Sequence, residues 1–298
     1  MAVLPQIRSQ RRRSVEPTSE MPGSLRHRLL LLLPGITWLF IFGILPLGLV
    51  VAYSFAQRGV YGGVEFSFTL ESYLRLADPL YLKILWRSFA FATLTTLLCL
   101  LLGYPLAYAI ATSAEPHKSR LLLLVIIPFW TNFLIRTYAW IIILRGQGLI
   151  NAILMGLGLV TEPVNMLYTP AAVLIGFVYN WLPFMVLPLY ASIEKIDRSY
   201  IEAAMDLGAQ GRAVFTKVIL PLSLPGIATG SILVFIPSIA EFAIPDLLGG
   251  ARTMLVGNLI KNQFLSARNW PFGSAASVAL MVAMLIGLLA YKRAIPSD

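Results

Sequence analysis

The chain has 298 residues, of which 58% are hydrophobic and only 12% are charged. Soluble domains carry about 25% charged residues, so the composition argues against a surface that faces water on all sides and favours one that faces lipid. Lys and Arg outnumber Asp and Glu by 23 to 14. These basic residues lie between apolar runs and not in patches on a polar scaffold, which argues against a nucleic-acid-binding protein.

Cysteine and histidine are too scarce for most enzymatic or metal-binding sites. Cys99 is the only cysteine, which excludes an intrachain disulfide and a thiolate metal cluster. It lies within an apolar run, so we expect a buried, inert thiol. His27 and His117 both fall in polar connecting segments. We therefore expect no metal site, no bound cofactor and no catalytic residues in this chain.

The first 28 residues are basic and contain three prolines. We expect a disordered tail over residues 1–28, held in the cytoplasm and in contact with anionic lipid headgroups. A cleaved signal peptide is not expected, because the apolar run that follows is too long for a signal h-region and lacks a small-residue cleavage site. Residues 29–293 are predicted to form one membrane domain, and residues 294–298 a short C-terminal tail.

Six apolar segments are long enough to cross a membrane, since a span needs roughly 20 apolar residues to cross a hydrocarbon core of about 30 Å. They are Leu29–Phe55, Ser88–Ala114, Leu121–Leu144, Pro163–Ile193, Val218–Ala240 and Asn269–Tyr291. The spanning part of the fourth is expected to begin near Pro170. All should be helical, because lipid offers no partner to unpaired backbone groups. The predicted fold class is an all-α integral membrane protein with about six transmembrane helices.

Lys and Arg in the connections predict the orientation, because they favour the cytoplasmic side. With an even number of spans the two termini share a side, and that side collects 14 Lys and Arg residues, six of them in the N-terminal tail, against eight on the opposite side. We therefore expect both termini in the cytoplasm. The first external loop, Ala56–Arg87, is long enough to hold a short helix around Leu70–Leu76.

The connection between the fourth and fifth spans, residues 194–222, is polar and well patterned, and is called the 194–222 loop below. Glu202, Ala203 and Ala204 are good helix formers, and Gly208 is a natural helix stop. A second short helix is predicted over Arg212–Ile219, ended by Pro221. The alanines form a small surface that another protein could approach closely, with Glu202 free to pair with a basic residue. The alternative is an ordinary amphipathic connector that lies on the membrane.

The order of residues in this loop is specific. Glu-Ala-Ala, three residues, Gly, nine residues and Val-x-Leu-Pro resemble the signature of ABC importer permeases, with Val218 where isoleucine is usual. Further stretches resemble the polyamine importer permeases, the putrescine type above all: Ile127–Trp140, Leu233–Pro237, Glu241–Gly250 and Arg268–Pro271. The likeness covers residues 29–293 approximately. Asp246 departs from the pattern, because it stands where a glutamate is usual.

The resemblance implies a type I importer that moves putrescine or spermidine inward. In such an importer two permease subunits form the pore, and for polyamines the second is a different chain. A dimer of cytoplasmic ATPase subunits docks on the loop that carries Glu202, Ala203, Ala204, Gly208 and Pro221, and an extracytoplasmic binding protein delivers the substrate. This chain has no Gly-x-x-x-x-Gly-Lys-Ser/Thr phosphate loop, so ATP and Mg are expected in the partner ATPase.

Ionisable residues at membrane depth are candidates for the substrate path. They are Arg136, Glu241 and Asp246. A polyamine needs carboxylates, and aromatic faces can add cation–π attraction. Glu241 and Asp246 lie about 140° apart on an ideal helix, but Pro237 and Pro245 could turn both toward one pore. The candidate aromatic residues are Tyr138, Trp140 and Trp181, with Trp130 and Tyr179 as further possibilities.

Simpler interpretations of these residues stay open. Glu241 could pair with Arg136 as a structural bridge, Asp246 could lie at the external interface, and the aromatic residues could serve packing or the interfacial belt. The same architecture could carry another solute, such as an amino-acid derivative or an opine-like amine. An ion-coupled secondary transporter would show matched internal repeats, and a membrane-embedded enzyme would need clustered His, Asp or Cys residues. Neither feature is evident.

Overall fold

The computed structural model describes residues 25–60 and 62–294. It divides the chain into two units, one up to Leu49 and one from Val50 onward, and each is described by itself. Most of the predicted basic tail and all but one residue of the predicted C-terminal tail lie outside the described residues. Residues 25–28, which the sequence assigned to the tail, belong to the first helix.

The first unit is a nearly continuous helical rod. Helix α1 (Leu25–Leu39) passes through one π-helical stretch, η1 (Phe40–Ile44), into α2 (Leu45–Ser54), which crosses into the second unit. From Leu31 to Val51 it carries no charged side chain and has no polar face, which is typical of a membrane span and not of a surface helix. This rod corresponds to the first predicted span.

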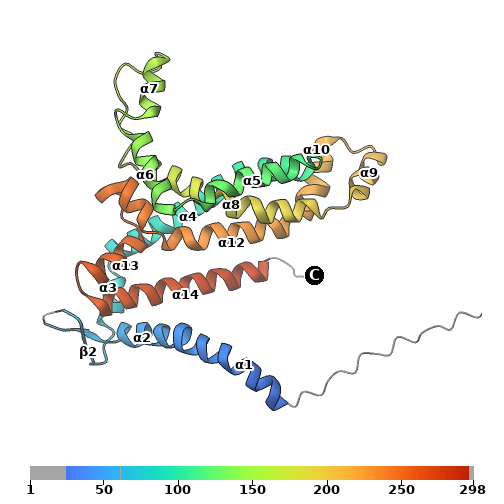
Figure 1. Cartoon of the computed structure of the whole chain (residues 1–298). Coiled ribbons are helices and arrows are strands. Elements are labelled where there is room, and N and C mark those ends of the chain that lie inside the picture. The colour runs from blue at the N-terminus through green and yellow to red at the C-terminus, as the bar shows by residue number, and fades with distance from the viewer. Residues whose placement is uncertain (1–24, 61, 295–298) are drawn as a thin grey trace, which may run out of the picture. The chain divides into compact units, whose positions relative to one another are not determined.

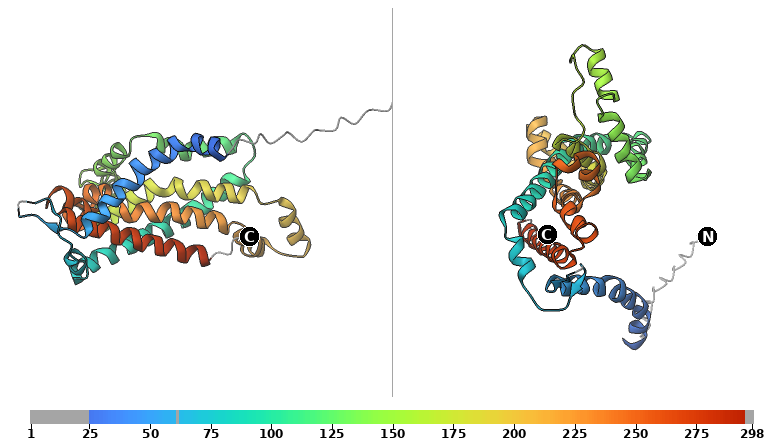
Figure 2. Two further views of the ribbon diagram at one scale, coloured as in Figure 1. Left: turned by 90° about the horizontal axis from the view of Figure 1, so that it is seen from below. Right: turned by 90° about the vertical axis from the view of Figure 1, so that its left-hand side faces the viewer.

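Three helices form the centre of the second unit. Helices α4 (Pro79–Thr112), α8 (Pro170–Glu194) and α12 (Leu224–Ala240) lie side by side (Figures 1 and 2). Their buried residues include Cys99, Tyr104, Ile110, Met185, Val186, Leu189 and Val234. Gly230 allows α12 to approach α8, because a Cβ there would lie 2.8 Å from Met185 Sδ. Small residues at such crossings let membrane helices pack closely.

The second span begins nine residues earlier than the predicted start at Ser88. Asp78 caps α4 by accepting a hydrogen bond from the Leu80 N–H at 2.8 Å, and Pro79 occupies the first helical turn. Both are helix-start signals. The helix therefore extends beyond the apolar run, and the first external loop ends at Asp78 and not at Arg87.

The third predicted span, Leu121–Leu144, is broken. Helix α5 (His117–Trp130) ends at an extended Thr131, and α6 (Phe133–Leu144) restarts two residues later. Asn132 caps α6 by accepting from the Leu134 N–H at 2.8 Å, and Thr131 Oγ1 donates to the Pro128 carbonyl at 2.7 Å. Side-chain partners of this kind satisfy the backbone where a membrane helix is interrupted.

Most of the remaining elements lie at the end of the bundle opposite the 194–222 loop, and helix α14 (Trp270–Ala294) runs from that end along the bundle (Figure 1). Strands β1 (Gln57–Arg58) and β2 (Val64–Glu65) form a small antiparallel hairpin, followed by α3 (Glu71–Leu76), which confirms the predicted short helix. Helices α7 (Leu149–Gly156) and α13 (Val256–Leu265) were not anticipated. Helix α14 packs against α13 and α3.

Within the described residues, five helices are long and apolar enough to cross a membrane. A sixth arises if the pair Gly211–Leu222 and Leu224–Ala240, bent by 61°, counts as one span. The prediction of about six spans is confirmed. The boundaries of the third differ, because the apolar stretch that qualifies by length is Phe133–Gly156 and not Leu121–Leu144.

Candidate functional site

The first half of the 194–222 loop is a short helix with well-defined ends. Helix α9 (Arg198–Asp206) starts at Asp197, whose carboxylate accepts a hydrogen bond from the Ser199 N–H at 2.9 Å. This bond lowers the pKa of Asp197 below its ordinary value. The helix ends at Asp206, and Gly208, two residues later, has a φ of +84°, in the left-handed region that favours glycine. The predicted helix and its glycine stop are confirmed.

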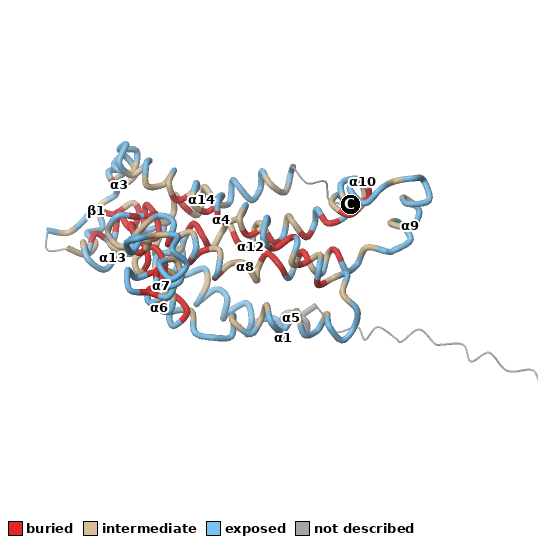
Figure 3. Tube along the Cα trace, turned by 90° about the horizontal axis from the view of Figure 1, so that it is seen from above, coloured by how far each residue is buried: buried red, intermediate tan, exposed pale blue. Residues whose placement is uncertain are grey.

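The segment around α9 is largely exposed (Figure 3). Of the motif residues in the 194–222 loop, Glu202, Ala203, Gly208 and Pro221 are exposed and Ala204 is half-buried. Three large apolar side chains on the same segment are also exposed: Tyr200, Met205 and Leu207. Leu207 is 89% exposed. A loop that presents large apolar side chains outward beside exposed acids, here Glu202 and Asp206, is typical of a surface that another protein covers.

The second half of the loop fixes α9 to the bundle. Helix α10 (Gly211–Val214) continues through η2 (Phe215–Ile219) into α11 (Leu220–Leu222). The Phe215 ring packs edge-on against Tyr104 and Tyr108 of α4, with ring centroids 5.5 and 6.5 Å apart. Val214 and Ile219 are buried. The base of the loop is therefore part of the core, while its tip is exposed.

The prediction that Pro221 ends the second helix is wrong. Pro221 lies inside the helical run, and the 61° bend comes at Ser223. In a regular helix the ring of Pro221 would clash with the carbonyl four residues earlier. The wider π turn of η2 shifts that carbonyl away, so the chain stays helical through Pro221. The bend is held to α4, because the Tyr104 hydroxyl and Ser223 Oγ are hydrogen-bonded at 2.9 Å.

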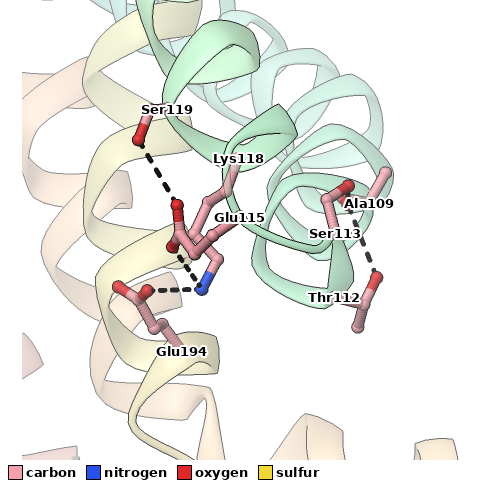
Figure 4. Close-up of polar contacts among 7 residues, drawn as sticks. All are labelled: Ala109, Thr112, Ser113, Glu115, Lys118, Ser119 and Glu194. Atoms are coloured by element: carbon pink, nitrogen blue, oxygen red, sulfur yellow. Dashed lines mark hydrogen bonds and ion pairs between the residues drawn. The ribbon is translucent and has the colours of Figure 1, made fainter.

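An ion pair holds the other end of the loop. Lys118 Nζ lies 2.8 Å from Glu194 Oε1 and 3.5 Å from Glu115 Oε1 (Figure 4). Lys118 is in the first turn of α5, before the apolar run, and the bond to Glu194 raises its pKa. Glu194 is the last residue of α8, three residues before the cap of α9. This pair links the start of α5 to the segment that positions the loop.

A second polar region lies at the opposite end of α12 and is called the α12–η3 break. The helix ends at Ala240, and Glu241 and Phe242 are not helical. Pro237 does not interrupt α12. Glu241 Oε1 accepts a hydrogen bond from the Ala243 N–H at 2.7 Å, which starts the next helical turn. Helix α13 crosses here at Gly257, where a Cβ would lie 2.5 Å from the Ala240 carbonyl oxygen.

Asp246 belongs to η3 (Pro245–Gly249) and is paired. One carboxylate oxygen, Oδ1, accepts from Asn258 Nδ2, and the other, Oδ2, accepts from Lys261 Nζ. Both partners come from α13. The Lys261 ammonium also lies 5.6 Å from the centroid of the Phe242 ring. The charge of Asp246 is thus balanced by a lysine that the sequence analysis passed over.

The Glu241–Arg136 bridge considered from the sequence is wrong. Arg136 is buried at 8% exposure, and its guanidinium lies 5.5 and 6.0 Å from the ring centroids of Phe129 and Tyr179. The ion pairs among the described residues are those of Lys118 and Lys261, and none includes Arg136 or Glu241. Arg136 therefore leaves the charge of Glu241 uncompensated.

The candidate aromatic residues separate into two groups. Trp140 and Trp181 pack against the apolar cluster that contains Ile244 and Leu248 of the segment following Glu241. Their ring partners are Tyr179 and Phe184, each at 5.5 Å. Tyr138 is exposed on α6, with no aromatic partner among the described residues. Packing accounts for the two tryptophans, and the role of all three residues in the substrate path stays a prediction.

The sequence analysis missed Asn258 and Lys261. Both lie in α13, a short helix of mixed polarity that carries no span-like pattern. The sequence offered one indication of this pairing. Lys261 is a basic residue twenty positions after Glu241, in a segment that follows a predicted span, and it could have been considered as a partner for an acid there. Spacing in the sequence could not place its ammonium on Asp246, because the chain turns back between the two.

Comparison with known proteins agrees with this geometry. Residues 28–296 match the family described as binding-protein-dependent transport system inner membrane component. The chain is 48% identical over 261 residues to the Spermidine/putrescine transport system permease protein PotB of Escherichia coli K12, covering 87% of this chain and 94% of that protein. It is 45% identical over 258 residues to the protein of that name from Haemophilus influenzae, covering 87% and 90%.

Solved structures show the same fold at lower identity. A bacterial ABC transporter involved in the import of the acidic polysaccharide alginate superposes with a TM-score of 0.73 at 20% identity, covering 90% of this chain and 96% of that chain. The alginate transporter in complex with its alginate-bound periplasmic protein gives a TM-score of 0.74 at 18% identity, covering 89% and 93%. The predicted type I permease fold is confirmed. With the family matched from residue 28 to residue 296, the chain belongs to the inner membrane components of binding-protein-dependent transport systems and is the permease subunit of an ABC transporter.

Proposed function

We propose that this chain is a pore subunit of an ATP-driven importer that moves polyamines, putrescine or spermidine, into the cytoplasm. The observation that carries the proposal is the identity of 45–48% over 87% of the chain to permeases named for spermidine and putrescine. Two acids at the end of α12 suit a cationic substrate, because ionisable residues at membrane depth commonly mark a substrate path. A secondary transporter working alone does not fit a family defined by dependence on a binding protein.

The 194–222 loop is proposed as the docking element for a dimer of cytoplasmic ATPase subunits. Its exposed tip, with Glu202, Ala203 and Leu207, is the part that a partner would cover. Its base is anchored to α4 through Phe215 and Ser223, so force on the tip reaches the bundle directly. ATP and Mg then belong to the ATPase, and this chain needs no cofactor.

The opposite end of the bundle is proposed to face the extracytoplasmic binding protein. This end carries the β1–β2 hairpin, α3, α7 and the α12–η3 break (Figure 1). In this arrangement the termini are cytoplasmic, and substrate released by the binding protein meets Glu241 and Asp246 early in its passage. A second permease subunit, a different chain, completes the pore.

The decisive experiment is the ATPase activity of the reconstituted complex, titrated with binding protein loaded with putrescine, spermidine or an unrelated amine. Stimulation by a polyamine and not by the unrelated amine supports the proposal and names the substrate. A complex that hydrolyses ATP but responds only to an amino-acid derivative or an opine-like amine overturns the polyamine assignment and keeps the permease architecture.

A further inference from the structure

A cavity of about 280 Å³ lies between α3, the start of α4, α13 and α14. Helix α3 packs against α14 at this end of the bundle (Figure 3). The cavity lining is apolar apart from the hydroxyl groups of Tyr73 and Tyr81. The Tyr73 hydroxyl donates to Ser54 Oγ at 2.7 Å, so it is satisfied within the chain. A space with so few polar partners suits an apolar chain and not water.

The cavity crosses the membrane boundary on the α3 side. Two exposed tryptophans mark that boundary: Trp86 lies just before the uncharged run of α4, and Trp270 is the first residue of α14. Tryptophan is enriched at membrane interfaces. The lining residue Leu280 is ten residues beyond Trp270, which places it about 15 Å further along the helix. The cavity therefore extends from the interface into the hydrocarbon region, where it is surrounded by lipid.

The surface beside the cavity is also apolar. Leu74 of α3 and Leu80 and Leu82 of α4 are exposed, although all three precede the uncharged run of α4. Leaving large apolar side chains in water is costly. These side chains are placed as in segments that lie among lipid headgroups with their apolar residues toward the acyl chains. Lipid therefore accounts for what covers this surface.

Arg75 places a positive charge at the rim of the cavity. Its guanidinium lies 5.0 Å from the ring centroid of Phe272 and 6.0 Å from that of Tyr81. The two ring centroids are 4.8 Å apart, and Phe272 is buried, so the support is well packed. The Tyr81 ring also lines the cavity. Stacking on rings leaves the N–H donors of the guanidinium available to an anion at the mouth of the cavity.

No side chain in the described part of the chain forms an ion pair with Arg75. The other charged residues of α3 and the start of α4 are Glu71, Asp78 and Lys83. Asp78 is engaged as the cap of α4, and Glu71 and Lys83 are exposed. Arginine is well suited to phosphate, because its planar fork matches two phosphate oxygens at once. The charge at the rim is therefore complementary to a phosphate group.

We propose that Arg75 and this cavity form a binding site for a phospholipid of the leaflet on the α3 side. The phosphodiester pairs with the Arg75 guanidinium, and one acyl chain enters the cavity. The ligand joins a phosphate to an apolar chain, and the Tyr81 ring joins the cation to the apolar cavity in the same way. The bound chain packs against Val256 and Leu259 of α13 and so holds α3 and α13 to the bundle. The inference does not depend on which solute the transporter carries.

Photolabelling of the purified complex in nanodiscs of phosphatidylethanolamine and phosphatidylglycerol tests the inference. The probe is a phosphatidylglycerol with a diazirine in its acyl chain, and mass spectrometry identifies the labelled peptides. The wild type should be labelled at residues 276–280 of α14. Ala279→Leu fills the cavity and should lower this labelling at least about tenfold, because each buried methylene group contributes to binding. Ala290→Leu is the matched control, since Ala290 is exposed on the same helix outside the cavity.

The phosphate contact is tested separately. Arg75→Gln should lower labelling by the same probe about fivefold, the effect of an ion pair at a partly exposed site. Arg145→Gln is the control, because Arg145 is exposed at the same end of the bundle and does not line the cavity. A diacylglycerol probe with the same chains lacks the phosphate and should label the wild type about fivefold less. Inorganic phosphate should not compete with the phosphatidylglycerol probe.

Equal labelling of Ala279→Leu and Ala290→Leu overturns the inference, because lipid then contacts α14 without entering the cavity. Equal labelling of the wild type by the two probes, or full competition by inorganic phosphate, also overturns it. A wild-type complex left unlabelled at residues 276–280 overturns it as well and assigns the cavity to a partner subunit. Basal ATPase activity verifies the assembly of each variant. If Arg75→Gln assembles poorly, the comparison of the two probes on the wild type still decides whether a phosphate is recognised.

Discussion

The 194–222 loop and the α12–η3 break are both polar interruptions of an apolar chain, at opposite ends of one bundle (Figure 1). They differ in whether a carboxylate is paired within the chain. In the loop, Glu202 is exposed and has no ion-pair partner among the described residues. In the break, Asp246 is held by Asn258 and Lys261. The loop leaves Glu202 for another protein, whereas the break pairs Asp246, though not Glu241, with a cation of the same chain.

The difference follows from solvent. At the loop, water satisfies an unpaired carboxylate, so exposure costs little. In the break the Asp246 side chain is only 33% exposed, so an unpaired charge is more costly there, and Lys261 serves as its counter-ion. The exposed acid of the loop is therefore free for a partner protein, whereas the charge of Asp246 is neutralised within the chain.

The largest expected effect is at the exposed end. Glu202→Lys reverses the charge of the motif acid on the outward face of α9 and should lower the apparent affinity for the ATPase at least thirtyfold, roughly what a loss at the centre of an interface costs. The measurement is ATPase stimulation in the reconstituted complex.

Glu162→Lys is the matched control, because Glu162 is exposed at the other end of the bundle and should leave ATPase docking unchanged. If the Glu202→Lys complex shows wild-type stimulation of ATPase activity, Glu202 does not contribute to the ATPase-docking surface. The loop and the break would then differ only in how exposed their polar residues are.

Glu241→Gln tests the membrane end. The amide oxygen of glutamine can still accept the Ala243 N–H that Glu241 now holds, so the backbone break should survive while the charge is lost. We expect polyamine uptake to fall by roughly tenfold in kcat/KM, with normal assembly and basal ATPase activity, because a carboxylate that stabilises a cation contributes on the order of one tenfold step. Uptake at the wild-type rate would show that Glu241 serves only as a helix cap.

Gly208→Ala tests whether the backbone conformation of the loop matters for docking, because it leaves the exposed side chains of α9 unchanged. Gly208 has a φ of +84°, but a Cβ there would meet nothing within 4 Å. The substitution therefore costs about 1 kcal/mol of backbone strain without any clash, which corresponds to roughly fivefold weaker stimulation of the ATPase.

Gly211→Ala is its control, since Gly211 also has open space around it and no positive φ. If both alanine variants behave alike in the titration of ATPase stimulation, the left-handed turn at Gly208 is not what positions α9.

The smallest effect is expected for the Lys118–Glu194 pair. Exposed ion pairs contribute little and are screened by salt, so Lys118→Met should change stimulated ATPase activity by less than about twofold, with no difference at high salt. Glu194→Gln and the double variant complete the cycle. If Lys118→Met lowered stimulated ATPase activity as much as Glu202→Lys, the Lys118–Glu194 ion pair and not the exposed tip would be the main contributor to coupling.

Much of this protein could be predicted without coordinates. The apolar runs predicted about six helical spans, because the backbone N–H and C=O groups of each run must be hydrogen-bonded within the run when it lies in lipid. The order Glu202, Ala203, Ala204, Gly208 predicted a helix with a glycine stop, since both are local properties of the backbone. The start of α4 was missed although Asp78 and Pro79 are local signals, because hydropathy and not capping was used to place it.

Tertiary structure decided what the distant residues do. Arg136 and Glu241 looked like partners because both are charged and lie in apolar segments, yet Arg136 lies against Phe129 and Tyr179. Trp140 and Trp181, candidates for the substrate path, pack against the buried cluster that contains Ile244 and Leu248, a packing partner that the sequence did not indicate.

The sequence by itself determined the class of protein, the number of spans and the outward surface of α9, because hydropathy, helix propensity and exposure to water act on neighbouring residues. The tertiary structure alone decided that Asp246 meets Lys261. That contact depends on the chain breaking at Glu241 and returning through α13 across Gly257, and the geometry of a return is set by packing between segments, which no local pattern records.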